Sequence, residues 1–248
     1  MIMKGRPVRV AVISDIHANL IAFEAVLAAC RPFDVVWCLG DIVGYGPRPR
    51  ECIALLRSLP YLCVVGNHDY AAIGRLNLDE FNPVAQRATA WTAAALTVDD
   101  VSFLTALPNR IIDDPVTLVH GSPRQPVWEY IYDPRTAREN FALLDTAICF
   151  LGHTHICSVF VEHEVRQGRM RQPRPGDSYQ MSEGRALINP GSVGQPRDGD
   201  PRAAYAIYDT GAGRVEFGRV EYDIASTQRQ MEEAGLPAPL VRRLAIGY

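Results

Sequence analysis

The sequence predicts an α/β protein built around parallel strands. Three apolar runs rich in β-branched residues, at 8–13, 34–39 and 61–65, are separated by segments with helical spacing at 19–30 and 50–59. Continuous apolarity of this kind is typical of parallel strands that are covered on both faces. The β-α-β-α-β order requires crossover connections, which are right-handed in nearly all proteins. The N-terminal part of the chain is therefore expected to form one α/β unit.

The alternation of strands and helices is interrupted after residue 70, and strand patterns resume at residue 116. Between residues 71 and 107, Ala-rich helical segments predict a small helical cap inserted into a single domain that spans 1–248. The Gly-, Pro- and Arg-rich segment 166–180 predicts a mobile hairpin or loop, to which the sequence assigns no role. A polar helical segment is expected at 225–235. The expected cap helices are 83–97 and 99–107, and the later strands are 116–120, 147–153, 156–165, 186–188, 203–209 and 214–223.

Composition excludes several classes of protein. With 48% hydrophobic and 21% charged residues, the 248-residue chain has the profile of a globular protein. A formal net charge of −3 provides no basic field for extended nucleic acid, whereas a small phosphate ester remains compatible because a bound metal can supply positive charge. No apolar run approaches the roughly 20 residues of a membrane span. The six cysteines form no C-x-x-C pair, which predicts free, buried thiols in the reducing cytoplasm. Nothing in the sequence indicates an oligomeric state.

Reactive polar residues follow the strands. The first three strands end in SDIH at 14–17, GD at 40–41 and GNHD at 66–69, and two later ones end in VHGS at 119–122 and GHTH at 152–155. Five of the six histidines therefore lie at strand ends. Because ligands of α/β sheets bind in the crevice at the carboxyl ends of the strands, these motifs predict one shared site.

The chemistry of this site is expected to be that of a metal pair. Aspartate oxygens and neutral imidazoles suit Mn²⁺, Fe, Co²⁺, Ni²⁺ or Zn²⁺, and the number of histidines disfavours Mg²⁺ and Ca²⁺. In Asp-x-His and His-x-His, residues i and i+2 of an extended segment would turn two side chains toward one point. A shared carboxylate can hold two metals about 3.5–4 Å apart, which suits in-line displacement at phosphorus. Taken singly, each of these residues would be an ordinary turn or capping residue.

The complete ordered series of motifs resembles the calcineurin-like metallophosphoesterase superfamily, in particular its small bacterial and archaeal phosphodiesterase-like branch. The resemblance implies a four-layer α/β/β/α sandwich, with the site where the two sheets meet. It also implies two divalent transition-metal ions, Mn²⁺ first among the candidates. One would be bound by Asp15, His17 and His155, the other by Asn67, His120 and His153, and Asp41 would bridge them.

Catalysis is expected to involve His68, which the resemblance places opposite the substrate. An imidazole can protonate a leaving oxygen or stabilise phosphoryl charge near neutral pH. The neighbouring Asp69 is expected to shape the loop. The resulting hypothesis is a phosphoesterase that hydrolyses phosphodiesters by in-line attack of a metal-bridging hydroxide. The alternatives are a dinucleoside polyphosphate hydrolase or a phosphomonoesterase on the same site, or a catalytically silent protein-binding scaffold with this fold. The presence of His68 and of every expected ligand disfavours the scaffold.

Substrate contacts are less sharply defined. Protein phosphatases and symmetrical diadenosine tetraphosphatases of the superfamily carry an arginine shortly after the bridging aspartate, where this chain has Tyr45. That departure disfavours both substrate classes unless another arginine substitutes. Arg124, Arg197 and Tyr45 are the candidate substrate contacts, with a small phosphate ester as the expected partner and no membrane or extended nucleic-acid surface. The remaining expectations are stacking by Trp128 or Tyr130, a phosphate contact by Arg75, a supporting turn at Asn189-Pro190-Gly191, and an exposed strand position for His163.

Overall fold

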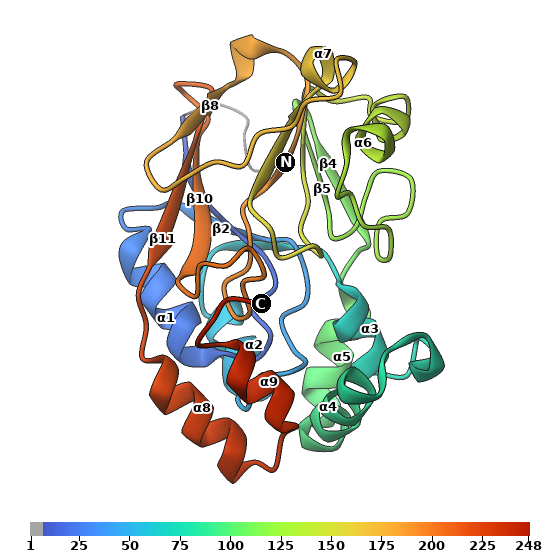
Figure 1. Ribbon diagram of the computed structural model, residues 1–248, viewed down its shortest axis with the longest axis vertical. Helices are drawn as coiled ribbons and strands as arrows, with labels where there is room; N and C mark the ends of the chain where they lie inside the picture. The colour runs from blue at the N-terminus through green and yellow to red at the C-terminus, as the bar shows by residue number, and fades with distance from the viewer. Residues whose placement is uncertain (1–6) are drawn as a thin grey trace.

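The computed structural model describes residues 7–248, which form two β-sheets packed face to face with helices outside them (Figure 1). The first sheet has the strand order β3-β2-β1-β10-β11-β8. Its parallel half, which the N-terminal pattern predicts, consists of β1 (Arg9–Ile13), β2 (Val35–Cys38) and β3 (Tyr61–Cys63). The antiparallel half consists of β10 (Ala203–Asp209), β11 (Arg214–Val220) and β8 (Ser178–Gln180).

The second sheet has the strand order β4-β5-β6-β9-β7. Its parallel strands are β5 (Val116–Val119), β6 (Ile148–Phe150) and β9 (Ala186–Asn189). The antiparallel edges are β4 (Arg110–Asp113) and β7 (Ser158–Val161). Each sheet therefore presents the carboxyl ends of several parallel strands in the same region of the molecule.

The core between the sheets is aromatic at its centre. Trp37, Phe150 and Tyr208 are fully buried, and their ring centroids lie 5.6–5.9 Å apart, within the range of favourable aromatic contacts. On the outer face of the first sheet pack α1 (Leu20–Ala29) and α2 (Pro49–Arg57). On the outer face of the second sheet pack α6 (Pro134–Phe141) and α7 (Glu162–Val165). This arrangement confirms the predicted four-layer α/β/β/α sandwich.

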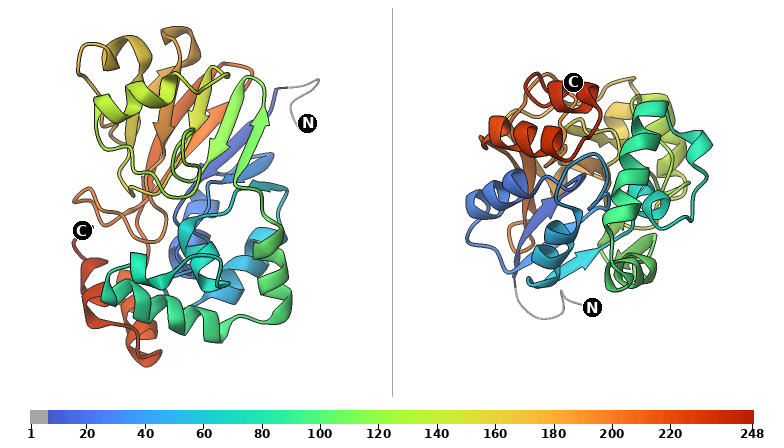
Figure 2. Two further views of the ribbon diagram at one scale, coloured as in Figure 1. Left: turned by 90° about the vertical axis from the view of Figure 1, so that its right-hand side faces the viewer. Right: turned by 90° about the horizontal axis from the view of Figure 1, so that it is seen from below.

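Helices from two distant parts of the sequence lie at one end of the molecule (Figure 2). Segment 71–107 contains the end of α3 (Asn67–Ala72), the 3₁₀ turn η1 (Leu78–Glu80), α4 (Pro83–Ala95) and α5 (Val98–Ala106). The C-terminal helices are α8 (Ile224–Glu233) and α9 (Ala238–Arg243). An apolar cluster joins α4 to both C-terminal helices and includes Tyr45, so this end of the protein covers one side of the loops that follow the strands.

Several boundaries differ from those that the sequence predicts. The strand expected over 156–165 ends at Val161, which pairs with Ala186, the first residue of β9. Beyond that pair no strand among residues 7–248 continues the ladder, residues 162–165 form α7, and His163 is exposed on this helix rather than on a strand. Part of 166–180 is also regular, because β8 pairs with β11. The strand β4 and the helices α6 and α9 have no counterpart in the sequence prediction.

No helix formed by residues 7–248 combines the length and the hydrophobicity that crossing a bilayer requires.

Candidate metal centre

The polar motifs meet where the two sheets approach each other. Asp15 and His17 follow β1, Asp41 follows β2, and Asn67 begins the helix α3 just after β3. The second sheet contributes His120 directly after β5, and the loop between β6 and β7 contributes His153 and His155. All seven side chains are at most 3% exposed. The structure thus brings together every residue that the sequence predicts as a metal ligand.

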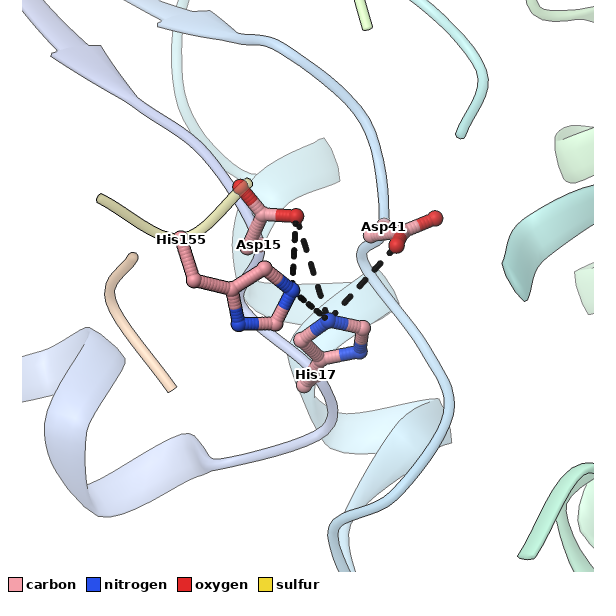
Figure 3. Close-up of side chains that lie close together, drawn as sticks. All are labelled: Asp15, His17, Asp41 and His155. Carbon is pink, nitrogen blue, oxygen red and sulfur yellow. Dashed lines mark hydrogen bonds and ion pairs between the residues drawn. The ribbon is translucent and has the colours of Figure 1, made fainter. Parts of the chain in front are cut away.

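The first cluster contains Asp15, His17, Asp41 and His155 (Figure 3). The Nε2 atoms of His17 and His155 lie 3.1 Å apart. Asp15 Oδ1 lies 3.3 Å from His155 Nε2 and 3.9 Å from His17 Nε2, and Asp41 Oδ2 lies 3.5 Å from His17 Nε2. Four atoms that can ligate a metal therefore surround one point.

The second cluster contains Asp41, His120 and His153, with Asn67 beside them. Around His120 Nε2 lie Asn67 Oδ1 at 3.0 Å, His153 Nδ1 at 3.1 Å and Asp41 Oδ2 at 3.4 Å. Asp41 Oδ2 is thus the atom common to both clusters. The other oxygen of this carboxylate accepts the backbone N–H of His68 at 2.8 Å, which fixes the orientation of the carboxylate.

Main-chain carbonyls determine which ring nitrogen of each histidine faces the clusters. Because a carbonyl can only accept, the Nδ1 atoms of His17, His120 and His155 donate to Val43, Leu39 and Gln195 at 3.2, 2.8 and 2.6 Å. The fourth ring, His153, donates through Nε2 to the carbonyl of Trp128 at 3.1 Å. In the rings of His17, His153 and His155 the opposite nitrogen then carries a lone pair directed into a cluster, as in histidines that bind metals, whereas His120 Nε2 donates to Asn67 Oδ1 at 3.0 Å.

A bound cation is the charge that this arrangement requires. In the first cluster, the lone pairs of His17 and His155 face each other at 3.1 Å, and Asp15 Oδ1 lies 3.3 Å from His155 Nε2, with no proton between these atoms, which is repulsive. In addition, Asp15 Oδ1 and Asp41 Oδ2 are buried and have no hydrogen-bond partner among residues 7–248. Buried acceptors of this kind are unfavourable unless a cation or a donor satisfies them. The mixed nitrogen and oxygen ligands therefore fit divalent transition-metal ions.

The electrostatic environment keeps three of the four histidines of the clusters in the neutral form that binds metals. Burial lowers the pKa of His17, His153 and His155, so these imidazoles are neutral at pH 7. Burial alone would raise the pKa of Asp41, but the nearby imidazoles of His120 and His68 hold it well below its usual range. Burial lowers the pKa of His120, yet the Asp41 carboxylate outweighs it and raises that pKa to about 9. A metal ion must therefore displace a proton from His120.

The backbone at the ligands is left-handed, not extended. The φ angles are 54° at Asp15, 48° at His17, 53° at Asp41, 67° at His153 and 60° at His155. Such conformations cost of order 1–3 kcal/mol each for residues other than glycine and concentrate at functional sites. The expected i, i+2 geometry of an extended segment is therefore wrong here. The two histidines of the GHTH motif serve different clusters, since His153 faces the second and His155 the first.

Two glycines of the motifs are required by close packing behind the ligands. A Cβ atom on Gly66 would lie 2.0 Å from Asp41 Oδ1, and one on Gly152 would lie 1.8 Å from Ser14 Oγ. Any side chain at these positions would displace Asp41 or the strand end that carries Asp15. The glycines in GNHD and GHTH thus allow the backbone of one loop to approach the ligand of another.

The segment 189–195 supports the ligand loops from behind. Asn189 Nδ2 donates to the carbonyl of Gly152 at 2.7 Å and to Thr154 Oγ1 at 3.0 Å, which holds the loop between His153 and His155. Ser192 Oγ donates to the carbonyl of Asp15 at 2.9 Å. Asn189 therefore contacts the metal-ligand loop without facing the clusters.

His68 lies beside the clusters within an aromatic pocket. Its ring centroid is 4.3 Å from that of Tyr45, 5.0 Å from that of His17 and 5.1 Å from that of Phe81. Asp69 accepts the backbone N–H groups of Val43 and Gly66, both at 3.0 Å. Asp69 thus ties the GNHD motif to the loop after β2, and the motif itself forms the first turn of α3 rather than a loop.

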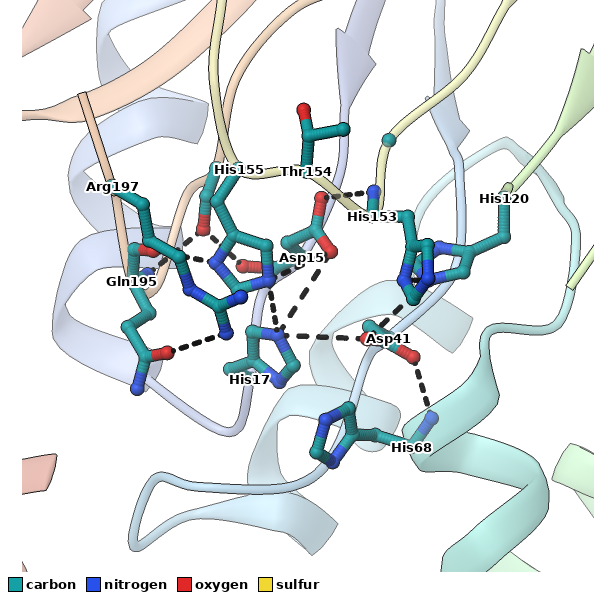
Figure 4. A network of polar contacts seen from close by, with 12 residues as sticks. Asp15, His17, Asp41, His68, His120, His153, Thr154, His155, Gln195 and Arg197 are labelled. Carbon is teal, nitrogen blue, oxygen red and sulfur yellow. Dashed lines mark hydrogen bonds and ion pairs between the residues drawn. The ribbon is translucent and has the colours of Figure 1, made fainter. Parts of the chain in front are cut away.

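The candidate substrate contacts divide into two groups. Tyr45 and Arg197 lie at the site, with the Arg197 guanidinium carbon 5.9 Å from the Tyr45 ring centroid and the guanidinium beside His17 and His155 (Figure 4). Arg124 does not join them, because Glu129 and Glu139 bind its guanidinium in a surface network. Arg75 is also engaged elsewhere, donating to the carbonyl of Thr105 at 3.3 Å.

Stacked aromatic rings extend outward from the second cluster. The Tyr130 ring lies flat against His153 at 3.7 Å, and Tyr132 stacks on Tyr130 at 5.2 Å. Both tyrosines are exposed, at 41% and 49%. Trp128 instead packs against Phe81 and contributes its carbonyl to His153. The sequence prediction missed Tyr132, although its alternation with Tyr130 in EYIY was a signal for two rings on one side.

Comparison with known proteins identifies the family. The model of the calcineurin-like phosphoesterase superfamily domain matches residues 8–213, and the chain belongs to that superfamily. A metallophosphoesterase from Sphaerobacter thermophilus is 55% identical, with a TM-score of 0.92 over 98% of this chain and 100% of its own. An uncharacterized protein of Methanocaldococcus jannaschii is 41% identical over 96% of this chain and 98% of its own. A symmetrical bis(5'-nucleosyl)-tetraphosphatase of Pectobacterium carotovorum is 28% identical over 54% of this chain and 50% of its own. Proteins of this superfamily hydrolyse phosphoester bonds and depend on divalent metals.

Proposed function

We propose that the protein is a binuclear metal-dependent phosphoesterase that prefers phosphodiesters. The observation that carries the proposal is the Asp41 carboxylate, whose Oδ2 lies 3.5 Å from His17 Nε2 in one cluster and 3.4 Å from His120 Nε2 in the other. A single buried oxygen atom that faces both groups of candidate ligands supports a shared position between two cations.

Each residue of the clusters would have a defined task. Asp15, His17, Asp41 and His155 would hold one cation, and Asp41, Asn67, His120 and His153 the other, with Mn²⁺ as the first candidate for both. When bound, the two cations supply the Lewis acidity that activates water for in-line attack and balances phosphoryl charge. The chain contributes ligands that are already oriented by backbone carbonyls, so that little reorganisation is needed on binding.

His68 would serve as a neutral hydrogen-bond donor to the leaving oxygen. Burial, together with the positive charge of Arg197, lowers the pKa of His68 to about 4 despite the opposing effect of Asp41. Its imidazole is therefore uncharged at pH 7, and it donates a hydrogen bond through its N–H group. The contact between its backbone N–H and Asp41 fixes its position relative to the clusters.

The test is His68→Asn, assayed on an alkyl and an aryl phosphodiester with the metal content measured in parallel. We expect unchanged metal content and a turnover of the alkyl diester that falls by about 10²-fold or more, since removing one hydrogen-bond donor to a developing oxyanion costs about 10²–10³-fold. The aryl diester should lose less, because its leaving group needs little assistance. His163→Asn is the matched control, exposed on α7. Equal turnover of the alkyl diester by His68→Asn and the wild type would refute the role.

A second candidate function is hydrolysis of dinucleoside polyphosphates. The similarity to the bis(5'-nucleosyl)-tetraphosphatase favours it, and so does the position of Arg197 beside Tyr45. A panel of phosphomonoesters, phosphodiesters and dinucleoside polyphosphates, assayed with each candidate metal, decides between the two. A protein that binds no transition metal and hydrolyses none of these esters would instead match the scaffold alternative.

We also propose a cytoplasmic location and a small phosphate ester as the partner. All six cysteines are free and buried, which supports a reducing compartment. Measuring the redox state of these thiols in cells tests the location.

A further inference from the structure

Two arginines converge beside the candidate metal centre, and neither pairs with a carboxylate side chain among residues 7–248. Arg197 Nη2 and Arg243 Nη1 donate to the same atom, Gln195 Oε1, at 3.0 and 3.2 Å. Gln195 is uncharged and only 1% exposed, and its main-chain carbonyl orients His155. None of the ion pairs with Asp or Glu side chains within residues 7–248 includes either arginine. The other contact of the Arg243 guanidinium is from Nε to the main-chain oxygen of Tyr248.

No Asp or Glu side chain among residues 7–248 balances the two positive charges in this position. Other partly buried arginines of the protein pair with carboxylates, as Arg219 does with Asp198 and Arg171 with Glu164. Burial and the nearby charge of Arg197 lower the pKa of Arg243. In addition, Arg197 Nε is buried and has no acceptor among the residues that the structure describes. Donors and charge of this kind are stabilised by an anion from outside the protein.

The pair lies next to the groups that would meet the substrate. Arg197 lies over Tyr45, whose ring is 4.3 Å from His68 and 4.6 Å from His17. Arg197 lines a cavity of about 410 Å³, whereas Arg243 and Tyr45 line another of about 210 Å³. A group bound between the two guanidinium groups would therefore be adjacent to His68, with space on either side for the remainder of a larger molecule.

We propose that Arg197 and Arg243 form a second anion subsite, which binds a phosphoryl group adjacent to the one that is cleaved. The substrate is then a phosphate ester that carries at least two phosphoryl groups in succession. This inference rests on the proposed function, because it requires that the scissile phosphoryl group binds at the metal centre. Guanidinium forks suit this role, since each can donate two parallel hydrogen bonds to phosphate oxygens.

The experiment compares pyrophosphate with orthophosphate as probes. Both are titrated calorimetrically into metal-loaded protein freed of excess metal, and the metal content is measured again afterwards. We expect the wild type to bind pyrophosphate at least tenfold more tightly than orthophosphate. Arg197→Gln and Arg243→Gln should each lower this preference at least fivefold. Arg135→Gln on α6, whose side chain is 83% exposed, is the control and should keep it.

Conservative variants separate a lost subsite from a damaged fold. Arg243→Lys keeps the charge and should retain more of the preference than Arg243→Gln, with thermal melting confirming that both variants fold. The inference is overturned if the wild type binds the two anions equally, or if the preference for pyrophosphate survives both glutamine substitutions. In either case the proposed function still stands as long as the protein hydrolyses diesters and binds orthophosphate. A wild type that binds neither anion and hydrolyses no ester overturns both.

Discussion

The Nε2 atoms of His17 and His155 face each other at 3.1 Å, although each ring has its proton on the opposite nitrogen, where it meets a carbonyl. Two lone pairs at this distance repel each other unless a cation lies between them. Nearby, Asp15 Oδ1 adds a third electron-rich atom, 3.3 Å from His155 Nε2. The folded state therefore contains a local repulsion that a metal converts into an attraction.

Removing metal should accordingly destabilise the protein. A ligand at 100 times its Kd contributes about 2.7 kcal/mol to folding, and 1 kcal/mol shifts the Tm of a chain of this size by about 2–4 °C. Chelation should thus lower the Tm by about 5–10 °C, and restored Mn²⁺ should reverse the change. The decrease in Tm on chelation should be smaller in His155→Ala than in the wild type. It should be unchanged in His163→Ala, because His163 is exposed on α7. The same Tm with and without chelator would contradict this account.

Asp41→Ala should affect both metal positions at once. Its Oδ2 atom is common to the two clusters, so its loss removes a ligand from each. We expect the metal content, measured by plasma mass spectrometry, to fall from about two ions per chain to less than one. Ester hydrolysis should fall by at least about 10³-fold. The control is Asp79→Ala, an exposed residue of η1. Retention of both ions by Asp41→Ala would disprove the shared position.

Gly66→Ala should displace a ligand that is distant in sequence. The added Cβ atom would lie 2.0 Å from Asp41 Oδ1, so the carboxylate must move. Overpacking of this kind costs about 1–3 kcal/mol, and metal content should fall with stability. Gly176→Ala is the control, because its φ of +92° carries a backbone penalty of about 1–2 kcal/mol but nothing lies within 4 Å. Gly176→Ala should lose stability without losing metal, and a Gly66→Ala protein with full metal content would count against the packing argument.

Tyr132→Ala should weaken the binding of aromatic esters selectively. Tyr132 is 49% exposed and stacks at 5.2 Å on Tyr130, which covers His153. Stacking of an aromatic group on such a ring is worth about 1–3 kcal/mol, so the KM for bis(p-nitrophenyl) phosphate should rise by about tenfold. The KM for a dialkyl phosphate should change less than twofold. Val98→Ala, 85% exposed on α5, serves as the control. Equal changes for both substrates would exclude stacking.

The positions of the candidate metal ligands could be predicted from the sequence because each follows a strand whose apolar pattern is continuous. The strands before Asp15 and Asp41 lie next to each other in one parallel sheet, which is what the β-α-β order requires. The convergence of His120 and His153 with them depended on the family resemblance, since no local pattern indicates how two sheets pack. The way in which the ligands turn inward was not predictable, because left-handed backbone at aspartate and histidine has no reliable sequence signature.

Residues around the ligands escaped prediction for a different reason. Gln195 and Arg243 are 48 positions apart and meet only through tertiary packing. The strand β4 is short and half-buried, so its residues do not show the continuous apolarity that marked its parallel neighbours. Charge alone makes Arg124 a candidate substrate contact in the sequence. Its partners Glu129 and Glu139 come from the loop after β5 and from α6, and their positions beside Arg124 depend on tertiary packing.

The ligands of each cluster come from both sheets, and the last of them to be synthesised are His153 and His155. A nascent chain that ends before this loop holds two aspartates and a few histidines but no finished cluster. The proposed metals would therefore find complete sites only after the two sheets have docked and the main-chain carbonyls have oriented the histidine rings.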